Sequence, residues 1–301
     1  MTSAVTVRVP AKVNVYLGVG SKQFDGYHPI ATVFQSVGIY DEVKIESADE
    51  FTIIPAGSFR DAIPTDQSNL VFKAVQLVAQ ACGQDPNVAV TITKSIPVAA
   101  GMAGGSADAA AALLASDAFW QAGIPRSQLD AMARTLGADV LFMLHGGCAL
   151  GTGRGDVLAP IMTRGTFHWV FATYKDGLST PAVYDRFDKL STLSDDYIPE
   201  VPSDVLAALT RSDIEVLGDL LHNDLQIAAL TLRPSLAGAL EFGLDHGALG
   251  AIVSGSGPTC AFLVKDEVTA IDLRVALSAS GLVDQAIHTH GPVHGARIIQ
   301  H

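Results

Sequence analysis

A glycine-rich segment that runs into an alanine-rich helix constrains this chain more than any other feature. The segment PVAAGMAGGSADAAAAL, at residues 97–113, places three glycines and a serine before a helical pattern over 107–120. The first amides of a helix lack intrahelical partners and lie at the positive end of its dipole, while glycines let an anion approach the backbone. The segment predicts a phosphate-binding loop, although a tight turn with a serine cap is an alternative reading.

This loop differs from a Walker P-loop. It has no Gly-Lys-Ser or Gly-Lys-Thr ending, which excludes a Walker nucleotide site at this position. Ser106 is the one hydroxyl at the start of the predicted helix. Its expected role is either to cap the helix or to ligate a Mg²⁺ ion that accompanies a nucleotide.

Composition narrows the class of partner. The chain has 301 residues, of which 49% are hydrophobic and 17% charged, as in a folded globular protein. Its net charge of −12 repels polyanions and no basic stripe is present, so nucleic acid is not an expected partner. An anionic substrate must instead be met locally, by backbone amides, by one or two Lys or Arg residues, and by a metal ion.

The length of the chain and a change in its character after Pro160 predict two lobes, 1–162 and 163–301. The N-terminus shows neither a secretory leader nor an anchor, and no apolar run approaches the ~20 residues that span a bilayer, so we expect a cytoplasmic protein without a membrane partner. Several strands come first and helices dominate later. The expected strands are 5–9, 13–19, 33–39, 42–47, 51–54 and 88–97, and the expected helices of the first lobe are 69–81, 107–120 and 128–136, the last capped by Ser127.

Lys12 and Asp139 are the candidate reactive groups. Lys12 lies in a segment that otherwise reads as a buried strand, and a buried lysine needs an anionic partner; the alternative is an edge-strand lysine that faces water. Asp139 follows a helix end and precedes a glycine-rich turn, where a cap or turn residue is the alternative to a general base. If the two meet, the pair suits phosphoryl transfer, because a carboxylate can take the proton of a hydroxyl that a lysine polarises.

Three further segments offer weaker signals. Residues 250–264 are an apolar strand broken by Ser-Gly-Ser-Gly-Pro, which indicates either close backbone approach to a ligand or a simple hairpin. Asp25-Gly26-Tyr27-His28 places an aromatic ring and an imidazole in one turn, which suits a clamp for a planar base as well as a plain type I turn. The C-terminal histidines His288, His290 and His294 have no carboxylate or cysteine company, so a solvated tail is preferred to a metal site.

Three segments, in this order, resemble the motifs of the GHMP kinase superfamily. They are PAKVN at 10–14, PVAAGMAGGSADAA at 97–110 and SGSGPT at 254–259. The resemblance implies a two-lobed α+β fold with ATP and the substrate in the cleft between the lobes. It also implies ATP and Mg²⁺ as cofactors, and it makes Lys12 and Asp139 the catalytic pair.

A second set of segments narrows the acceptor. DGYH at 25–28, VFQSV at 33–37 and residues 136–156 are similar to the superfamily members that phosphorylate the 2-hydroxyl of a cytidine-diphosphate-linked methylerythritol in the non-mevalonate isoprenoid pathway. By this resemblance Tyr27 and Tyr184 stack on the cytosine and His28 reads its edge. The resemblance further assigns ATP contacts to Pro97, Gly101, Met102, Ala103, Gly104, Gly105 and Ser106, a metal contact to Ser106, and substrate contacts to Asn14, Tyr27, His28, Tyr184, Gly255 and Ser256.

The chain departs from the family pattern at one place and leaves alternatives open. Ala107 stands where many relatives have a second serine, which leaves Ser106 as the sole hydroxyl, and Met143 and Leu144 are expected to pack rather than bind. A smaller alcohol such as homoserine or mevalonate is a second possible acceptor, but it has no base for the DGYH segment to hold. A regulatory nucleotide-binding protein is a third reading, which retention of both Lys12 and Asp139 disfavours. A monomer and a homodimer are both compatible with the sequence.

Overall fold

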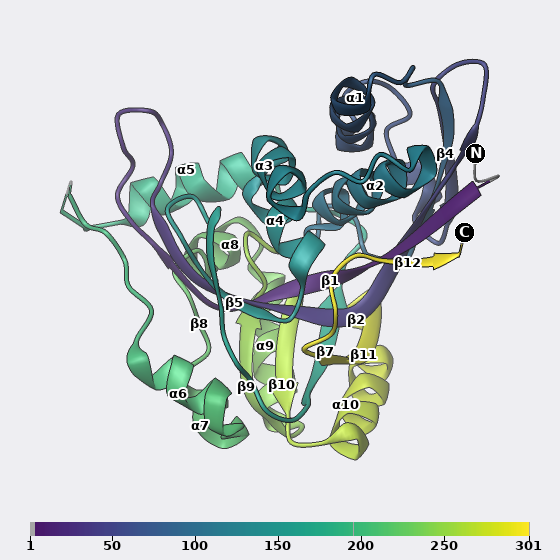
Figure 1. Cartoon of the computed structure of the whole chain (residues 1–301). Helices are drawn as coiled ribbons and strands as arrows, with labels where there is room; N and C mark the ends of the chain where they lie inside the picture. The colour runs from purple at the N-terminus through teal and green to yellow at the C-terminus, as the bar shows by residue number, and fades with distance from the viewer. Residues whose placement is uncertain (1–3, 195, 301) are drawn as a thin grey trace.

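The computed structural model describes residues 4–194 and 196–300, and in this part the chain forms two β-sheets flanked by helices (Figure 1). The large sheet runs in the order β12-β1-β2-β4-β3, with β5 and β6 continuing from β2 and β8 pairing with β1. The small sheet has the order β11-β7-β10-β9. The strands of the large sheet are β1 Ala4–Val19, β2 Ile30–Ser47, β3 Thr52–Gly57, β4 Val88–Lys94, β5 Cys148–Thr152, β6 Val157–Pro160, β8 His222–Asn223 and β12 Arg297–Gln300; those of the small sheet are β7 Phe167–Thr173, β9 Ala248–Val253, β10 Cys260–Val264 and β11 Gln285–Gly291.

The helices cover opposite sides of this pair of sheets. Helices α1 to α4 lie on one side of the large sheet, the small sheet lies on the other, and α9 and α10 cover the far face of the small sheet (Figure 1). None of the helices in the described ranges combines the length and apolarity that a membrane crossing requires. The helices are α1 Leu70–Cys82, α2 Gly104–Trp120, α3 Arg126–Leu136, α4 Ala138–His145, α5 Thr180–Leu190, α6 Ser203–Arg211, α7 Ile214–Asp219, α8 Gln226–Leu232, α9 Ser235–Asp245 and α10 Glu267–Ser280, with a short 3₁₀ turn at Arg60–Ala62.

The small sheet is buried on both faces, which explains why its central strands are almost continuously apolar. Side chains alternate along a strand, so Phe167, Trp169 and Phe171 of β7 face the core shared with the large sheet. Val170 and Ala172 face α9 and α10 instead. The indole Nε1 of Trp169 donates a 2.7 Å hydrogen bond to Gln35 Oε1 of β2, which ties the two sheets together.

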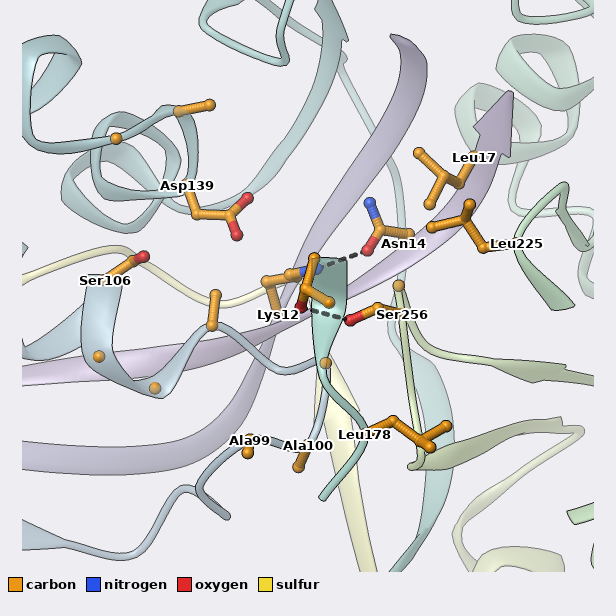
Figure 2. A pocket seen from close by; sticks show the side chains of 18 of the residues that line it. Lys12, Asn14, Leu17, Ala99, Ala100, Ser106, Asp139, Leu178, Leu225 and Ser256 are labelled. Carbon is orange, nitrogen blue, oxygen red and sulfur yellow. Dashed lines mark hydrogen bonds between the residues drawn. The ribbon is translucent and has the colours of Figure 1, made fainter. Parts of the chain in front are cut away.

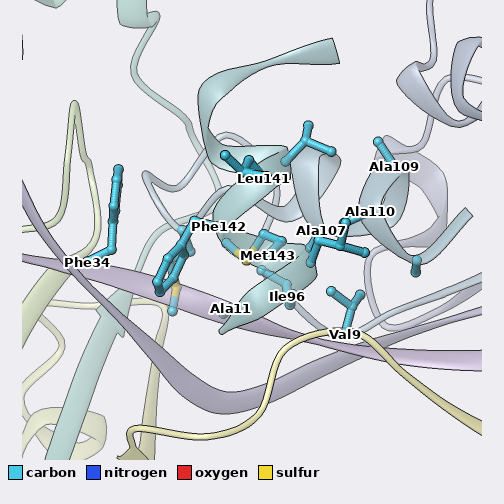
Figure 3. Close-up of a cluster of buried hydrophobic side chains, with 14 of the residues drawn as sticks. Val9, Ala11, Phe34, Ile96, Ala107, Ala109, Ala110, Leu141, Phe142 and Met143 are labelled. Atoms are coloured by element: carbon cyan, nitrogen blue, oxygen red, sulfur yellow. The ribbon is translucent and has the colours of Figure 1, made fainter. Parts of the chain in front are cut away.

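Helices α2 and α4 pack their small and aromatic residues directly on β1 and β2 (Figure 3). The alanine run of α2 is fully buried, because side chains this small let the helix lie close against its neighbours. The rings of Phe34 and Phe142 stack with centroids 5.0 Å apart. Met143 and Leu144 are buried, which confirms that they pack in the core. This packing fixes both helix N-termini relative to β1.

Several expected element boundaries are corrected by the structure. Strand β1 runs through Pro10 without a break, because a register shift beside β2 absorbs the proline. Helix α2 begins at Gly104 with Ala103 as its N-cap, so Ser106 lies inside the first turn and does not cap it. Helix α3 begins at Arg126 after Pro125, so Ser127 is not a cap either.

The C-terminal histidines also lie elsewhere than expected. His288 and His290 are part of β11, and His294 forms an isolated bridge with Gly146, so this segment is not a solvated tail. Two elements from beyond residue 162, β8 and β12, pair with β1 of the large sheet. The lobe boundary near residue 162 stays a prediction.

Candidate active site

A cavity of about 710 Å³ opens beside β1 and β2 of the large sheet. Its walls come from β1, the N-termini of α2, α4 and α5, and the turn between β9 and β10 (Figure 2). Eleven of the fifteen residues predicted for the site line it. They are Lys12, Asn14, Gly101, Ala103, Gly104, Gly105, Ser106, Asp139, Tyr184, Gly255 and Ser256.

Lys12 is buried in β1, as its strand pattern predicts. Its side chain is 5% exposed, and Nζ donates a 2.5 Å hydrogen bond to Asn14 Oδ1. The amide of Asn14 donates in turn to Thr32 Oγ1 at 2.8 Å, and that hydroxyl donates to the Tyr16 carbonyl. The chain of donors fixes the Asn14 amide with its oxygen toward Lys12.

Asp139 lies in the first turn of α4, where the helix dipole favours a negative charge. Burial lowers the pKa of Lys12 because it disfavours the charged ammonium, and the negative charge of Asp139 acts in the opposite direction. Among the ion pairs of the described residues, none joins these two side chains directly. The carboxylate therefore supports the ammonium through space, and Figure 2 shows both at the same cavity.

The glycine-rich loop is fixed to two other parts of the chain. The Lys12 amide donates to the Met102 carbonyl at 3.4 Å, and the Ser254 hydroxyl donates to the Gly101 carbonyl at 3.1 Å. Gly101 has a φ of +73°, and a Cβ there would lie 2.0 Å from the Ser254 carbonyl oxygen. Only glycine fits this contact. The three motifs singled out in the sequence therefore meet in space.

Two loop residues have a backbone conformation that is uncommon without glycine. Ala99 and Ala103 have φ values of 52° and 59°, and such outliers are common at ligand-binding sites. Of the predicted ATP contacts, Pro97 and Met102 are buried and do not line the cavity. Met102 is a core side chain, so any contact it makes with a nucleotide uses its backbone.

The expected base clamp is divided between cavity and surface. His28 is 8% exposed and its Nε2 lies 2.7 Å from Asp188 Oδ1. Its ring packs against Tyr184 with centroids 5.0 Å apart. Burial, followed by the charge of Asp139, raises the pKa of Tyr184 to about 12, so this phenol stays protonated at neutral pH. Tyr184 lines the cavity, whereas Tyr27 and His28 are not among its lining residues.

Tyr27 is 57% exposed, and one face of its ring is covered by Arg154. The Arg154 guanidinium carbon lies 3.9 Å from the ring centroid, and Nη2 donates a 2.6 Å hydrogen bond to Asp25 Oδ2. Arg154 also lines the cavity. The sequence interpretation missed this residue, because an arginine in a Gly-Arg-Gly turn has no signal that separates it from an ordinary surface arginine.

A buried charge cluster lies below the start of α2 and was also missed. Lys94 Nζ contacts Asp41 Oδ2 and Asp108 Oδ2, each at 2.6 Å. A Cβ on Gly104 would lie 2.8 Å from Lys94 Nζ, so the cluster supports the first residue of the helix. A signal was present in the sequence: Lys94 continues the buried alternation of β4, and Asp108 interrupts a run of alanines.

The donors near the loop suit Mg²⁺ bound together with a phosphate ligand. Within the described ranges, no group of three His, Cys, Asp or Glu side chains is placed to hold a metal ion unaided. Mg²⁺ is usually held by one or two protein oxygens together with substrate phosphates and water. Ser106 presents one such oxygen at the cavity, and Asp139 presents another.

Comparisons with known proteins agree with this geometry. The models of the GHMP kinases N terminal domain and of the GHMP kinases C terminal match residues 69–147 and 205–282. The chain is 50% identical to a 4-diphosphocytidyl-2-C-methyl-D-erythritol kinase of Mycolicibacterium gilvum, over 99% of this chain and 94% of the relative. A crystal structure of 4-(cytidine 5'-diphospho)-2C-methyl-D-erythritol kinase is 31% identical, with a TM-score of 0.77 over 95% of this chain and 99% of that one.

A homoserine kinase from Cytophaga hutchinsonii shares the fold at lower identity. Its crystal structure gives a TM-score of 0.76 at 19% identity, over 99% of this chain and 98% of that one. At this identity the likeness shows the fold alone. It carries no argument for the acceptor.

Proposed function

The chain belongs to the GHMP kinases and, within them, to the 4-diphosphocytidyl-2-C-methyl-D-erythritol kinases, and we propose that its cleft transfers the γ-phosphoryl group of ATP to the 2-hydroxyl of the methylerythritol unit. It is a small-molecule kinase with ATP as its phosphate donor. One observation carries the assignment of the site: a buried lysine, a carboxylate and a glycine-rich helix N-terminus line the same cavity.

The N-terminus of α2 is the proposed phosphate site. Gly104 and Gly105 expose backbone amides there, and these amides lie at the positive end of the helix dipole. Ser106 and the phosphate oxygens of ATP would hold Mg²⁺, which when bound neutralises charge on the phosphates. Local positive charge at this site would thus let an acidic protein bind the phosphates of ATP.

Asp139 and Lys12 are the proposed catalytic pair. Asp139 accepts the proton of the substrate 2-hydroxyl, and the hydroxyl oxygen forms a bond to the γ-phosphorus of ATP. The bond from that phosphorus to the β,γ-bridging oxygen breaks, which releases ADP. Lys12 places a positive charge beside the reacting oxygen, and Asn14 fixes the position of the Lys12 ammonium through its 2.5 Å hydrogen bond. Phosphoryl transfer needs little more than this positioning and charge.

The cytosine is proposed to lie near Tyr27, His28 and Tyr184. His28 Nε2 lies 2.7 Å from Asp188 Oδ1, and in the tautomer that carries its proton on Nε2 the Nδ1 atom can accept a hydrogen bond from an exocyclic amino group. The free face of Tyr27 and the ring of Tyr184 offer flat surfaces for stacking. Gly255 and Ser256 are proposed to contact the acceptor from the turn after β9.

A coupled assay of ADP release tests the acceptor. The protein is incubated with ATP, Mg²⁺ and cytidine-diphosphate methylerythritol, beside homoserine and mevalonate. We expect ADP only with the cytidylylated alcohol, and omission of Mg²⁺ should abolish it. Release with another alcohol would discard the base clamp, and no release with any alcohol would contradict the proposal. A cytoplasmic location and the choice between monomer and homodimer stay predictions.

A further inference from the structure

The cavity contains a second cation besides the catalytic lysine. Among the described residues that line it, Lys12 and Arg154 are the basic side chains and Asp139 is the carboxylic acid. Lys12 is already engaged with Asn14 and is proposed to act at the reacting oxygen. The chain has a net charge of −12, so a second anionic group of the substrate must find its positive partner locally. Arg154 is the side chain that can provide it.

Arg154 is held in place on three sides. It belongs to the turn between β5 and β6, where its own amide donates to Asp156 Oδ1 at 3.1 Å. Its guanidinium lies flat over the Tyr27 ring, 3.9 Å from the centroid, and Nη2 donates to Asp25 Oδ2 at 2.6 Å. The Tyr27 amide and then the Arg154 guanidinium lower the pKa of Asp25, because both donate hydrogen bonds to its carboxylate. An arginine ordered in this way loses little freedom when it binds a further anion.

The guanidinium still has donors to offer. A guanidinium carries five N–H groups in a planar fork, and the side-chain hydrogen bonds described for Arg154 use Nη2 alone. Stacking on a ring leaves the edge of the fork accessible, and that edge matches two phosphate oxygens at once. Because Arg154 lines the cavity, a ligand inside it can reach this edge.

The order of groups in the substrate points to the same residue. This step rests on the proposed function, in which the base lies near Tyr27 and the alcohol near Lys12 and Asp139. The diphosphate joins the base to the alcohol, so it must lie between these two places. Arg154 contacts Tyr27 and lines the cavity that Lys12 and Asp139 share.

We propose that Arg154 binds the diphosphate of the substrate and makes the site specific for a nucleoside-diphosphate-linked alcohol. Asp25 and Tyr27 hold the guanidinium ready, and Asp156 fixes the turn that carries it. Arg154 is thus a specificity-determining residue that touches the substrate away from the reacting atoms.

Two probes that differ only in the diphosphate test the proposal. Isothermal titration calorimetry measures the Kd of cytidine diphosphate and of cytidine for the unchanged protein and for Arg154→Ala. We expect Arg154→Ala to raise the Kd of cytidine diphosphate by ~10–100-fold, the usual effect of a lost hydrogen bond to a charged group. The Kd of cytidine should change by less than about twofold. Arg154→Lys should recover part of the loss, because it restores the charge without the fork.

Matched controls separate binding from folding. Arg134→Ala makes the same charge change at an arginine that also bonds Asp156 but does not line the cavity, and it should leave both Kd values unchanged. Melting temperatures identify any variant that is not folded, and Arg154→Lys then replaces Arg154→Ala as the test. An equal rise in the Kd of both probes would contradict the proposal and mean that Arg154 only positions Tyr27. An unchanged Kd of cytidine diphosphate would also overturn the proposal.

The proposed function fails separately from this inference. If the unchanged protein phosphorylates the cytidylylated alcohol but Arg154→Ala keeps its preference for cytidine diphosphate over cytidine, only the role of Arg154 is lost. If the unchanged protein binds neither probe, the base clamp fails and the inference fails with it.

Discussion

At the scale of single residues, Lys12 and Asp139 influence each other electrostatically without forming a direct ion pair. Burial lowers the pKa of Lys12, and the Asp139 carboxylate opposes this effect without a direct ion pair. A carboxylate that is not locked to the lysine can accept a proton from a substrate hydroxyl placed beside it. The Asn14 amide, fixed by Thr32, takes the place of a salt bridge in positioning the ammonium.

Asp139→Asn should fold and bind both substrates but lose turnover. The change keeps the shape of the side chain and removes the proton acceptor, so we expect kcat to fall by ~10²–10⁴-fold, with the Kd of ATP and of cytidine diphosphate nearly unchanged. Asp130→Asn is a suitable control, because this carboxylate lies 2.9 Å from Nε2 of His145, the last residue of α4, and does not line the cavity. Near-normal kcat for Asp139→Asn would remove this residue from the proposed mechanism.

Sequence reasoning reached some of these residues and not others, for physical reasons. Lys12, Asp139 and the loop glycines were predicted because each belongs to a local pattern whose chemistry is readable without a fold. Arg154 was not, because its role depends on Tyr27, which is brought beside it by the pairing of β2 with β5. Long-range contacts of this kind leave no mark within a short window of sequence.

At the scale of elements, the phosphate loop is shaped by its contacts with other motifs more than by its own sequence. Gly101 meets Ser254, and Gly104 meets Lys94, whereas Gly105 has open space where a Cβ would lie. The three glycines therefore have different tasks. The first two permit close packing of the protein on itself, and the third leaves room for a ligand.

Alanine substitutions at Gly101 and Gly105 should have opposite effects on stability. Gly101→Ala forces a Cβ against the Ser254 carbonyl at a φ of +73°, so we expect unfolding to become easier by at least ~1–2 kcal/mol. Gly105→Ala lies in the first turn of α2 with nothing within 4 Å, so it should keep or raise stability by up to ~1 kcal/mol.

Urea unfolding and ATP titration distinguish the two variants. Gly105→Ala is expected to raise the Kd of ATP by roughly tenfold, because its methyl group fills the space proposed for a phosphate. A tenfold change corresponds to the loss of about one good hydrogen bond to a charged group. Gly238→Ala serves as the control, since it too has open space around the Cβ position but lies in α9 away from the cavity. A stable Gly101→Ala variant would show that the loop has an alternative path.

Element boundaries were the part of the fold that local patterns predicted least well. The expected strands 5–9 and 13–19 are one continuous strand, β1, which passes through Pro10 with a register shift beside β2. Helix α2 starts three residues before the expected Ala107, since burial of Gly104 against Lys94 and Ile96 outweighs the poor helix propensity of glycine. In both places tertiary contacts decided the outcome.

At the scale of the whole molecule, the cavity forms where β1 of the large sheet meets the turn that follows β9 of the small sheet. Asn223 of β8 donates to the carbonyls of Val253 and Gly255, which ties the turn after β9 to the strand that pairs with β1. The order of strands in the two sheets and the return of β12 to β1 were not predictable, because such pairings join residues almost a full chain length apart. The two-lobed α+β class was predictable from the motifs.

The buried cluster of Lys94, Asp41 and Asp108 makes the free energy of unfolding depend on whether Asp108 is protonated. Burial is the largest cause that raises the pKa of Asp108, to about 8, against the lowering effect of Lys94. One oxygen of Asp108, Oδ1, has no hydrogen-bond partner in the described residues, which is consistent with a disfavoured carboxylate. The two acids share a single ammonium, so one of them is easily left protonated.

This raised pKa fixes the sign of a pH effect on unfolding. Between about pH 4 and pH 8 the unfolded chain has released the Asp108 proton while the folded chain retains it, so the stability contributed by this group is present at low pH and is lost as the pH rises toward 8. The Asp108→Asn variant has no proton to release at this position, so it should not lose this stability as the pH rises. Its melting temperature, relative to that of the unchanged protein, should therefore rise by at least ~4 °C between pH 5 and pH 8.

Thermal unfolding monitored by circular dichroism across this range checks the prediction. Asp61→Asn makes the same chemical change at a side chain that is 96% exposed, and its difference in melting temperature from the unchanged protein should stay flat with pH. A flat difference for Asp108→Asn as well would mean that Lys94 keeps Asp108 ionised throughout the range. A rising difference would mean that the proton on Asp108 is part of the folded state, held within the helix whose N-terminus is proposed to bind ATP.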